Sequence, residues 1–464
     1  MQRNNKPEGQ EKYDCFRKEF SFLKYVGFKA YTNSIGLHVE YEFDLSGKYT
    51  FKPGFSIPAR RYFQNFPDYG TLQSPALQNL IFHIGLIELI SYWKVACPKE
   101  IHVIPGYLSE EQSLWCKNVY FQGLGEFFYT NKIEASFDDF LNISSSGKPS
   151  TCFNYELDDS IILPVGGGKD SVVTLELLRP TGKIRPFIMN PRGATLECVR
   201  VAGFGSDGFI EINRRLDPLL LQLNSQGFLN GHTPFSALLA FYCLLVSALS
   251  RHRHIALSNE SSANEPTVAG SSVNHQYSKS YAFESDFRDY VKKYISPEFN
   301  YFSFLRPLNE LQIARIFSEN YKYYPVFKSC NAGSKTDTWC CNCPKCLFAF
   351  TILSPFIPIE ELVNIFGKNL FEMPQMIPYL CELTGIEEVK PFECVGTIEE
   401  VNIALQLFAD QNKYKKLPLL LDYYKNTTLY DKYKPSDAQE LLNHINPEHF
   451  LDHHFLDIIA QKIK

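Results

Sequence analysis

Residues 161–173 read Ile161-Ile162-Leu163-Pro164-Val165-Gly166-Gly167-Gly168-Lys169-Asp170-Ser171-Val172-Val173. An apolar run rich in β-branched residues meets three glycines, and a second apolar segment then continues to Leu178. This pattern predicts a buried strand, a tight turn and a buried helix. Glycines at such a turn permit positive φ and let backbone N–H groups converge on an anion at the helix N-terminus.

The triplet Lys169-Asp170-Ser171 after the glycines indicates that the anion is a phosphate group bound together with a divalent cation. Lys169 adds a mobile positive charge, whereas Asp170 would repel a phosphate unless a divalent cation such as Mg²⁺ lay between them. The spacing is not that of a Walker A loop. It resembles the PP-loop, Ser-Gly-Gly-x-Asp-Ser, of ATP pyrophosphatases, which cleave ATP between the α and β phosphates. The stretch departs from that pattern at its first position, where Gly166 replaces Ser. The alternative to a phosphate-binding loop is a glycine-rich turn that binds no ligand. The expected ATP-binding residues here are Gly166, Gly167, Gly168, Lys169, Asp170 and Ser171.

Composition narrows the class of protein. The chain has 464 residues, 45% of them hydrophobic, and a net charge of −5, which argues against a general nucleic-acid surface. The first residues lack the apolar core of an export signal, so we expect a cytoplasmic protein. The longest apolar run, Phe235 to Leu249, is too short to span a bilayer and predicts a buried helix, with no membrane partner. The 13 cysteines are an odd number, which favours reduced thiols or a metal site over disulfides.

Three consecutive regions are expected. Residues 1–150 form an α+β region for support or substrate binding, with residues 1 to about 13 disordered and a linker at Asn142–Ser150. Its expected elements are strands at Gly36–Phe43 and Tyr49–Phe55 and helices at Gln78–Trp93 and Ser109–Phe128. Residues 151–350 form an ATP-binding domain that carries the cysteine cluster. Residues 351–464 are mostly helical, with clear periodicity at Thr397–Phe408 and Ala438–Ile445.

The middle region alternates strands and helices. Strands are expected at 160–165, 184–190, 209–213 and 254–259, and helices at 171–178, 194–201, 235–250, 279–294 and 309–319. This alternation predicts an α/β, doubly wound parallel sheet, and the PP-loop resemblance implies a HUP-like one. Ligands bind such sheets beyond the carboxyl ends of the strands. Asn190 could there contact adenine or ribose, and Glu260 could hold magnesium or orient the substrate. Each could equally cap the following helix.

A cysteine cluster follows the alternating segment. Cys330, Cys340, Cys343 and Cys346 have the spacing C-x9-C-x2-C-x2-C, and short gaps let a tight turn present two sulfurs to one tetrahedral ion. Four thiolates suit structural zinc, with Cys341 as a possible replacement for Cys340. An iron–sulfur cluster, redox cysteines and metal-free thiols are the alternatives. A similar zinc site occurs in the PP-loop enzymes that make the queuosine precursor.

Three further stretches occur together with the glycine loop and the cysteines. They are Ser258-Asn259-Glu260-Ser261-Ser262-Ala263-Asn264, Val273-Asn274-His275-Gln276-Tyr277-Ser278-Lys279-Ser280 and Lys390-Pro391-Phe392-Glu393-Cys394-Val395-Gly396. From about Leu163 to about Gly396 the chain resembles the UDP-N-acetylmuramoyl-L-alanyl-L-glutamate epimerase family. The resemblance implies that a small-molecule substrate, UDP-MurNAc-L-Ala-L-Glu, has its terminal L-Glu inverted to D-Glu in peptidoglycan synthesis. It also implies that ATP is converted to AMP and diphosphate.

Adenylation explains why an epimerase would consume ATP. A free carboxylate makes the adjacent Cα–H a very poor acid, and adenylation removes that negative charge. Lys169, Asp170, His275, Lys279 and Cys394 are the candidate catalytic residues, with Tyr277 and Glu260 as further candidates for the base. Magnesium and Lys169 would stabilise the leaving diphosphate.

Other readings of these residues remain open. His275 and Lys279 could instead bind phosphate, and Cys394 could be a buried structural thiol. Another PP-loop adenylating enzyme, such as an amide ligase or a nucleobase-modifying synthase, is the alternative function. A nucleotide-binding module without catalysis is less compatible with Asp170.

Overall fold

The chain folds into a mixed α/β structure with a large multi-stranded sheet and many helices. The computed structural model describes residues 8–59, 72–149, 151–268, 270–271, 273–413 and 416–463. It divides into two compact units. Unit 1 comprises Met1–Ser160, Ile210–Ile255 and Ser272–Asn300, and unit 2 comprises Ile161–Phe209, Ala256–Ser271 and Tyr301–Lys464. Each unit is therefore made of several separate stretches of the chain. The division into the consecutive regions 1–150, 151–350 and 351–464 stays a prediction.

Unit 1 is built on a mixed sheet with the strand order β9-β4-β2-β1-β5-β6, in which β3 also pairs with β2. Strands β1, β2, β4 and β9 are antiparallel, whereas β5 and β6 run parallel to β1 and to each other. The strands are β1 (Phe22–Thr32), β2 (Gly36–Leu45), β3 (Tyr49–Phe51), β4 (Gly54–Pro58), β5 (Glu100–Val103), β6 (Asn142–Ser145) and β9 (Ile210–Arg215).

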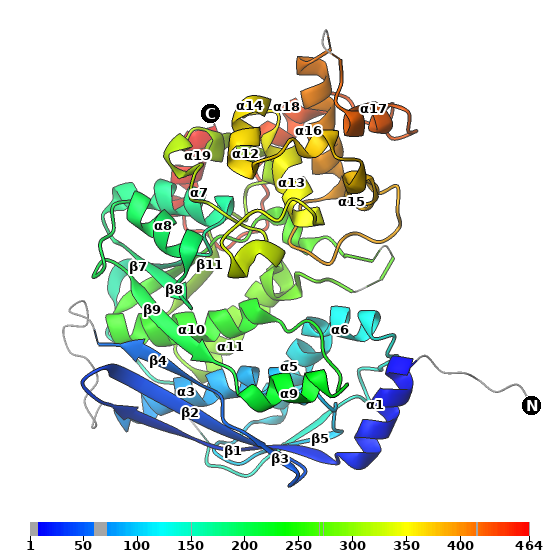
Figure 1. Ribbon diagram of the computed structural model, residues 1–464. Coiled ribbons are helices and arrows are strands. Elements are labelled where there is room, and N and C mark those ends of the chain that lie inside the picture. Colours follow the sequence, from blue (N-terminus) through cyan, green and yellow to red (C-terminus); the bar gives the residue numbers. More distant parts are fainter. Residues whose placement is uncertain are drawn as a thin grey trace, which may run out of the picture. The chain divides into compact units, whose positions relative to one another are not determined.

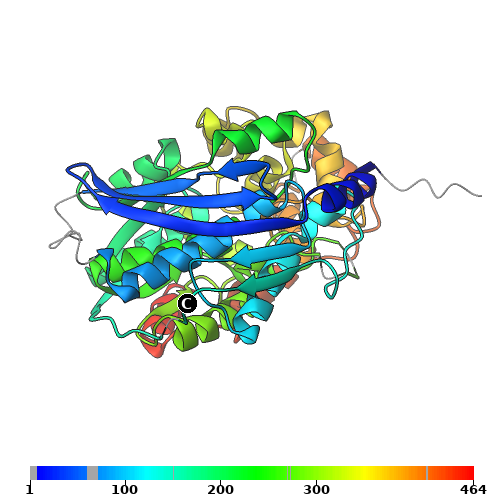
Figure 2. The ribbon, with the colours of Figure 1, turned by 90° about the horizontal axis from the view of Figure 1, so that it is seen from below.

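One face of this sheet is covered by helix α3 (Pro75–Glu88). Every second residue of β2 from Leu37 to Leu45 is buried, which is the period of a strand with one covered face. Tyr25 of β1 and Tyr41 of β2 project from the sheet, and their hydroxyls donate to carbonyl oxygens of α3 at 3.4 and 3.0 Å. Figure 1 shows α3 beside these strands, and Figure 2 shows β1 and β2 side by side from below.

The remaining helices of unit 1 include the expected ones at 235–250 and 279–294, whereas the expected helices at Gln78–Trp93 and Ser109–Phe128 are each divided in two. These remaining helices are α1 (Glu8–Glu19), α4 (Ile90–Trp93), α5 (Glu110–Gly123), α6 (Gly125–Thr130), α9 (Pro218–Ser225), α10 (Phe235–Ser250) and α11 (Tyr281–Tyr294). Ser109 and Gln112 form a capping box that starts α5. No helix within the described residues has the length and apolar character needed to cross a membrane.

Three expectations for the N-terminal region are wrong. Residues 8–13 belong to α1 instead of a disordered segment, and residues 1–7 lie outside the described part. The expected linker starts with strand β6, which its polar sequence concealed because β6 gains its hydrogen bonds from β5. The expected strand Tyr49–Phe55 is two strands, β3 and β4, since Pro53 cannot donate a ladder hydrogen bond.

Unit 2 contains β8 (Ile184–Met189) and the carboxyl ends of β7 (Asp158–Pro164), β10 (His252–Leu257) and β11 (Asn300–Ser303). The order is β11-β10-β7-β8, and β7 pairs parallel to β8 with Ile161 opposite Ile184 and Pro164 opposite Phe187. The helices are α7 (Lys169–Leu178), α8 (Gly193–Val201), α12 (Glu310–Ser318), α13 (Pro344–Leu353), α14 (Ile359–Phe366), α15 (Ile377–Thr384), α16 (Ile398–Gln411), α17 (Leu419–Lys425), α18 (Asp437–Asn443) and α19 (His453–Ile463).

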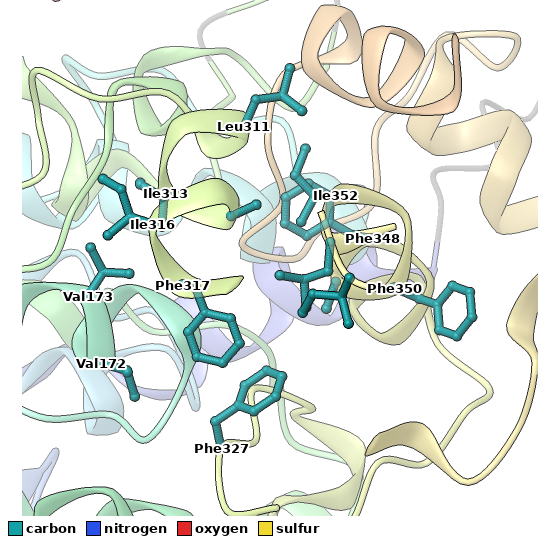
Figure 3. Packing of buried hydrophobic residues seen from close by; sticks show 14 of the residues in the cluster. Val172, Val173, Leu311, Ile313, Ile316, Phe317, Phe327, Phe348, Phe350 and Ile352 are labelled. Atoms are coloured by element: carbon teal, nitrogen blue, oxygen red, sulfur yellow. The ribbon is translucent and has the colours of Figure 1, made fainter. Parts of the chain in front are cut away.

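The core of unit 2 joins the helix after the glycine loop to the helices that follow the sheet. Val172 and Val173 of α7 lie near Ile316 and Phe317 of α12, and α13 adds Phe348 and Phe350 (Figure 3). The rings of Phe317 and Phe327 lie 4.5 Å apart. The N-termini of α7 and α12 are thus held by one continuous core.

Candidate functional site

The glycine loop connects β7 to α7, as the sequence predicts. Gly168 is the N-cap of α7, and Gly167 has a φ of +80°. A Cβ at Gly167 would lie 2.8 Å from the carbonyl carbon of Ala194, so glycine is required there. Gly166 has no atom within 4 Å of an added Cβ, and a serine would therefore fit. The Ser171 hydroxyl donates to the Gly168 carbonyl at 2.9 Å and stabilises the turn.

Lys169 is buried and held between two carboxylates, in contrast to the mobile cation expected from the sequence. Its ammonium contacts Asp170 and Glu310, the first residue of α12. The side chain of Glu310 is 3% exposed and that of Asp170 is 28% exposed. Burial disfavours the charged ammonium, but the two carboxylates outweigh burial and raise the pKa of Lys169. Lys169 is therefore a cation throughout the physiological range.

The region around Lys169 contains more acids than the sequence indicated. Burial raises the pKa of Glu310, and the negative charges of Asp170, Glu260 and Glu400 raise it further. The positive charge of Lys169 acts in the opposite direction. Burial also raises the pKa of Glu400, which accepts the Glu310 N–H at 2.8 Å. Glu310 and Glu400 carry no distinctive signal in the sequence, because both stand at ordinary helix starts, where acids are common.

Glu260 follows β10, as expected, and is buried. It is the N-cap of a short 3₁₀ helix (Ser261–Asn264), but its side chain makes no capping bond and instead accepts the Ser262 hydroxyl at 3.2 Å. The buried Arg306 guanidinium donates to the Glu260 carbonyl at 2.6 Å. Asn190 follows β8 with a φ of +51° and is exposed.

The segment Lys390–Gly396 lies beside the acidic group. A Cβ at Gly396 would be 3.0 Å from Cγ of Glu310 and 2.7 Å from Oε2 of Glu400. The Lys390 ammonium, 8% exposed, contacts Glu265 and donates to the Gly396 carbonyl at 2.9 Å. Cys394 in this segment is half-buried. Glu260 and the segment Lys390–Gly396, which are remote in sequence, thus both lie near Glu310 within unit 2.

The four cysteines expected to bind a metal are gathered in one place, with their sulfurs all within 4.8 Å of one another. Sγ of Cys330 lies 3.9 Å from that of Cys343, and Sγ of Cys340 lies 3.7 Å from that of Cys346. A zinc ion with Zn–S bonds of about 2.3 Å has sulfurs about 3.8 Å apart at tetrahedral geometry. Cys341 does not replace Cys340, because its thiol is directed to the Phe366 carbonyl at 3.2 Å.

The thiolate cluster adjoins the glycine loop. The Lys328 N–H donates to the Gly167 carbonyl at 2.9 Å, and a Cβ at Gly168 would lie 3.2 Å from that of Ser329. Between Cys330 and Cys340, Asp337 accepts the Ala194 N–H at 2.8 Å. The segment that carries the cysteines therefore contacts both the glycine loop and the first turn of α8.

His275 and Lys279 lie in unit 1. Only Tyr277–Lys279 is helical, a single 3₁₀ turn, so the two side chains do not share the face of an α-helix. His275 Nδ1 contacts Glu126 of α6, and the same carboxylate oxygen lies 3.3 Å from Nδ1 of His232. Burial and the charge of His275 lower the pKa of His232 to about 4. Tyr277 is buried, and its hydroxyl accepts from the Asn118 amide at 3.1 Å.

The chain matches two family models and three curated relatives. A family model described as the MurL N-terminal domain matches residues 15–304, and one described as the MurL C-terminal domain matches residues 326–437. Three curated relatives are each named UDP-N-acetyl-alpha-D-muramoyl-L-alanyl-L-glutamate epimerase. The protein of a Micromonospora species is 35% identical over 77% of this chain and 83% of its own. That of Salinispora tropica is 36% identical over 82% and 86%.

The third relative, from Xanthomonas oryzae pv. oryzae, is 33% identical over 82% of this chain and 85% of its own. No solved structure matches the chain. The two family models together cover the glycine loop, Glu260, Glu400 and the four clustered cysteines, whereas Glu310 lies between the two matched ranges. The resemblance noted from the sequence is thereby confirmed, and the chain belongs to the MurL family.

Proposed function

We propose that this protein is an ATP-dependent epimerase that inverts the terminal L-Glu of UDP-MurNAc-L-Ala-L-Glu to D-Glu during peptidoglycan synthesis. The observation that carries this proposal is the similarity to relatives named for this epimerase activity, at 33–36% identity and over 83–86% of their lengths. Isomerisation at a carbon next to a carboxylate also gives ATP a chemical purpose. Adenylation of the carboxylate would release diphosphate and make the Cα–H acidic, and hydrolysis of the acyl-adenylate after reprotonation would release AMP and restore the carboxylate.

We propose that unit 2 is a doubly wound PP-loop fold and that its glycine loop receives the ATP phosphates. The parallel pairing of β7 with β8 and the sharp turn into α7 support this. The first N–H groups of α7 have no partner within the helix and favour negative charge. Gly166 is exposed and leaves room for phosphate oxygens to approach the backbone.

The acidic group around Lys169 is the proposed magnesium site, with Asp170 as the proposed ligand. One ammonium faces Asp170 and Glu310, and Glu260 and Glu400 add further negative potential. Mg²⁺, when bound, would supply the positive charge that joins phosphate oxygens to these carboxylates and stabilises the leaving diphosphate. Asp170 is the more exposed of the two carboxylates and would be the one accessible to the ion, whereas the buried Glu310 is a positioning residue that holds the Lys169 ammonium.

The four cysteines fit structural zinc, and we assign the ion a supporting role. Closure of four thiolates around one ion leaves no position for a substrate. The ion would instead order the segment from Lys328 to Asp337, which contacts both Gly167 and Ala194. Cys394, two residues before Gly396, stays a candidate for proton transfer at Cα.

Hydrogen exchange at Cα tests the proposal. The protein, ATP, Mg²⁺ and the L-Glu muropeptide precursor are incubated in D₂O, and the product is examined for deuterium and configuration. Deuterium at Cα of a D-Glu product, formed together with AMP, is expected. A deuterium-free product or a new amide would refute epimerisation and indicate a ligase.

Two further arms test the activation step and the assigned residue. Exchange without ATP would refute adenylation as the activating step. Asp170→Asn should abolish AMP formation, whereas the matched control Asp207→Asn, at an exposed position of unit 2, should retain it. Equal AMP formation by the two variants would refute the role of Asp170.

A further inference from the structure

Three side chains in unit 1 converge outside the proposed nucleotide site. Glu126 of α6, His232 from the segment before α10 and His275 each offer one ligand atom, and these atoms lie within 4.8 Å of one another. Both imidazole Nδ1 atoms approach the same carboxylate oxygen, and the two rings lie 4.4 Å apart. The side chains are 11–21% exposed, so the group is largely shielded while still reachable from solvent.

The surrounding packing holds these ligands in place. Asn131 at the end of α6 donates to the Asn230 carbonyl at 3.0 Å, which fixes the segment of His232 to the helix of Glu126. The Lys94 ammonium contacts the carbonyl of Gly231, and Gly231 would meet Phe127 at 3.1 Å if it carried a Cβ. The arrangement therefore does not depend on freely moving side chains.

The geometry resembles the ligand set of a transition metal. Metal–nitrogen and metal–oxygen bonds of about 2.0–2.1 Å place neighbouring tetrahedral ligands about 3.3 Å apart. The distance from His232 Nδ1 to the Glu126 oxygen is 3.3 Å, and the closer contact of His275 with this oxygen must lengthen to the same spacing when an ion binds. Two imidazoles and one carboxylate are a common set for zinc and neighbouring divalent ions, and they leave at least one position open.

We propose that Glu126, His232 and His275 bind a divalent transition-metal ion, with zinc as the representative, whose open position accepts an anionic oxygen ligand. The nearby cations support the second part of this proposal. Lys94 and Lys279 both act electrostatically on His232. With a divalent ion and one carboxylate they leave a local excess of positive charge, which an anionic ligand would neutralise.

A cavity in unit 1 is lined by sequence neighbours of Glu126 and His275. It has a volume of about 540 Å³ and is lined by Gly125, next to Glu126, and by Val273, two residues before His275. Phe121, Phe128 and Tyr129 make its wall mainly apolar, with Glu134 and Ser136 as polar groups. An apolar cavity with a few polar groups is typical of small-molecule sites.

Cobalt titration of the full chain, freed of metal under reducing conditions, tests the proposal. We expect two ions per chain. One gives the sulfur-to-metal charge-transfer absorption of a thiolate site and is lost in Cys346→Ser, and the other gives only weak d–d bands. His275→Ala and Glu126→Gln should each weaken the affinity for the second cobalt ion at least tenfold. Neither substitution should change binding of the first, thiolate-bound ion. The matched control His38→Ala, on β2 of the same unit, should retain both ions.

The outcomes separate this proposal from the proposed function. Glu126→Gln preserves side-chain shape, so it decides the matter even if His275→Ala fails to fold. A Glu126→Gln variant that keeps the second ion, or a wild-type protein without any histidine-dependent ion, would overturn the metal site and leave a hydrogen-bonded His–Glu–His group. Inorganic phosphate should shift the d–d bands, and unchanged bands would refute the open position. None of these measurements of cobalt binding depends on ATP turnover.

Discussion

Substitution of Gly167 by alanine should damage the glycine loop, whereas the same change at Gly166 should not. Gly167 has a φ of +80°, and the left-handed region costs an L-residue about 1–2 kcal/mol. The new Cβ would lie 2.8 Å from the Ala194 carbonyl carbon and 2.9 Å from the Thr195 nitrogen. Both are backbone atoms of α8, and forced overpacking costs about 1–3 kcal/mol more.

The reduced freedom of alanine in the unfolded chain offsets about 0.4–1 kcal/mol of this cost. We therefore expect Gly167→Ala to lower the free energy of unfolding by about 2–4 kcal/mol. At Gly166 no atom lies within 4 Å of the added Cβ, and φ is not positive. Gly166→Ala should therefore change the free energy of unfolding by less than about 1 kcal/mol.

Urea unfolding followed by tryptophan fluorescence, together with AMP formation, measures both effects. Trp339 of unit 2 is buried against Phe327 and Phe366 and reports on the core next to the loop. Gly167→Ala should also reduce AMP formation, because a displaced Gly167 carbonyl loses the Lys328 N–H. Equal stability and turnover of the two variants would refute the assignment of the left-handed turn to Gly167.

The other predictions concern the zinc ion, the buried Glu310 and the pH dependence of stability. Removal of zinc by a chelator should lower the thermal midpoint of unfolding and weaken ATP binding, whereas Cys341→Ser should retain the zinc measured by elemental analysis. Glu310→Gln leaves Lys169 with Asp170 alone and should cost about 1–3 kcal/mol in urea unfolding; no change would refute their pairing. Burial lowers the pKa of His83 from 6.5 to about 4. Its contribution to stability is thus present above pH 6.5 and lost as the pH falls toward 4, by about 3 kcal/mol, and His83→Gln should flatten this dependence.

Local patterns predicted the elements of unit 2 well. The expected strand and helix on either side of the glycines are β7 and α7, and the expected Ile184–Asn190 strand is β8. Such segments carry their own signal, because apolar periodicity and glycine placement lie within a few residues. The expected strand 209–213 is also present, as β9, but it pairs antiparallel with β4 of the N-terminal region. Strand partners are set by long-range packing, which no local window contains.

The family, the glycine turn and the candidate cysteines could all be inferred from residue types at short spacing. Which thiols converge depends on packing: Cys340 joins the cluster, whereas the thiol of Cys341 is directed to the Phe366 carbonyl. Packing also brings Glu310 to Lys169 across 141 residues of sequence. Electrostatic partners of this kind are invisible along the chain, because only the packing of α7 against α12 brings their charges within contact.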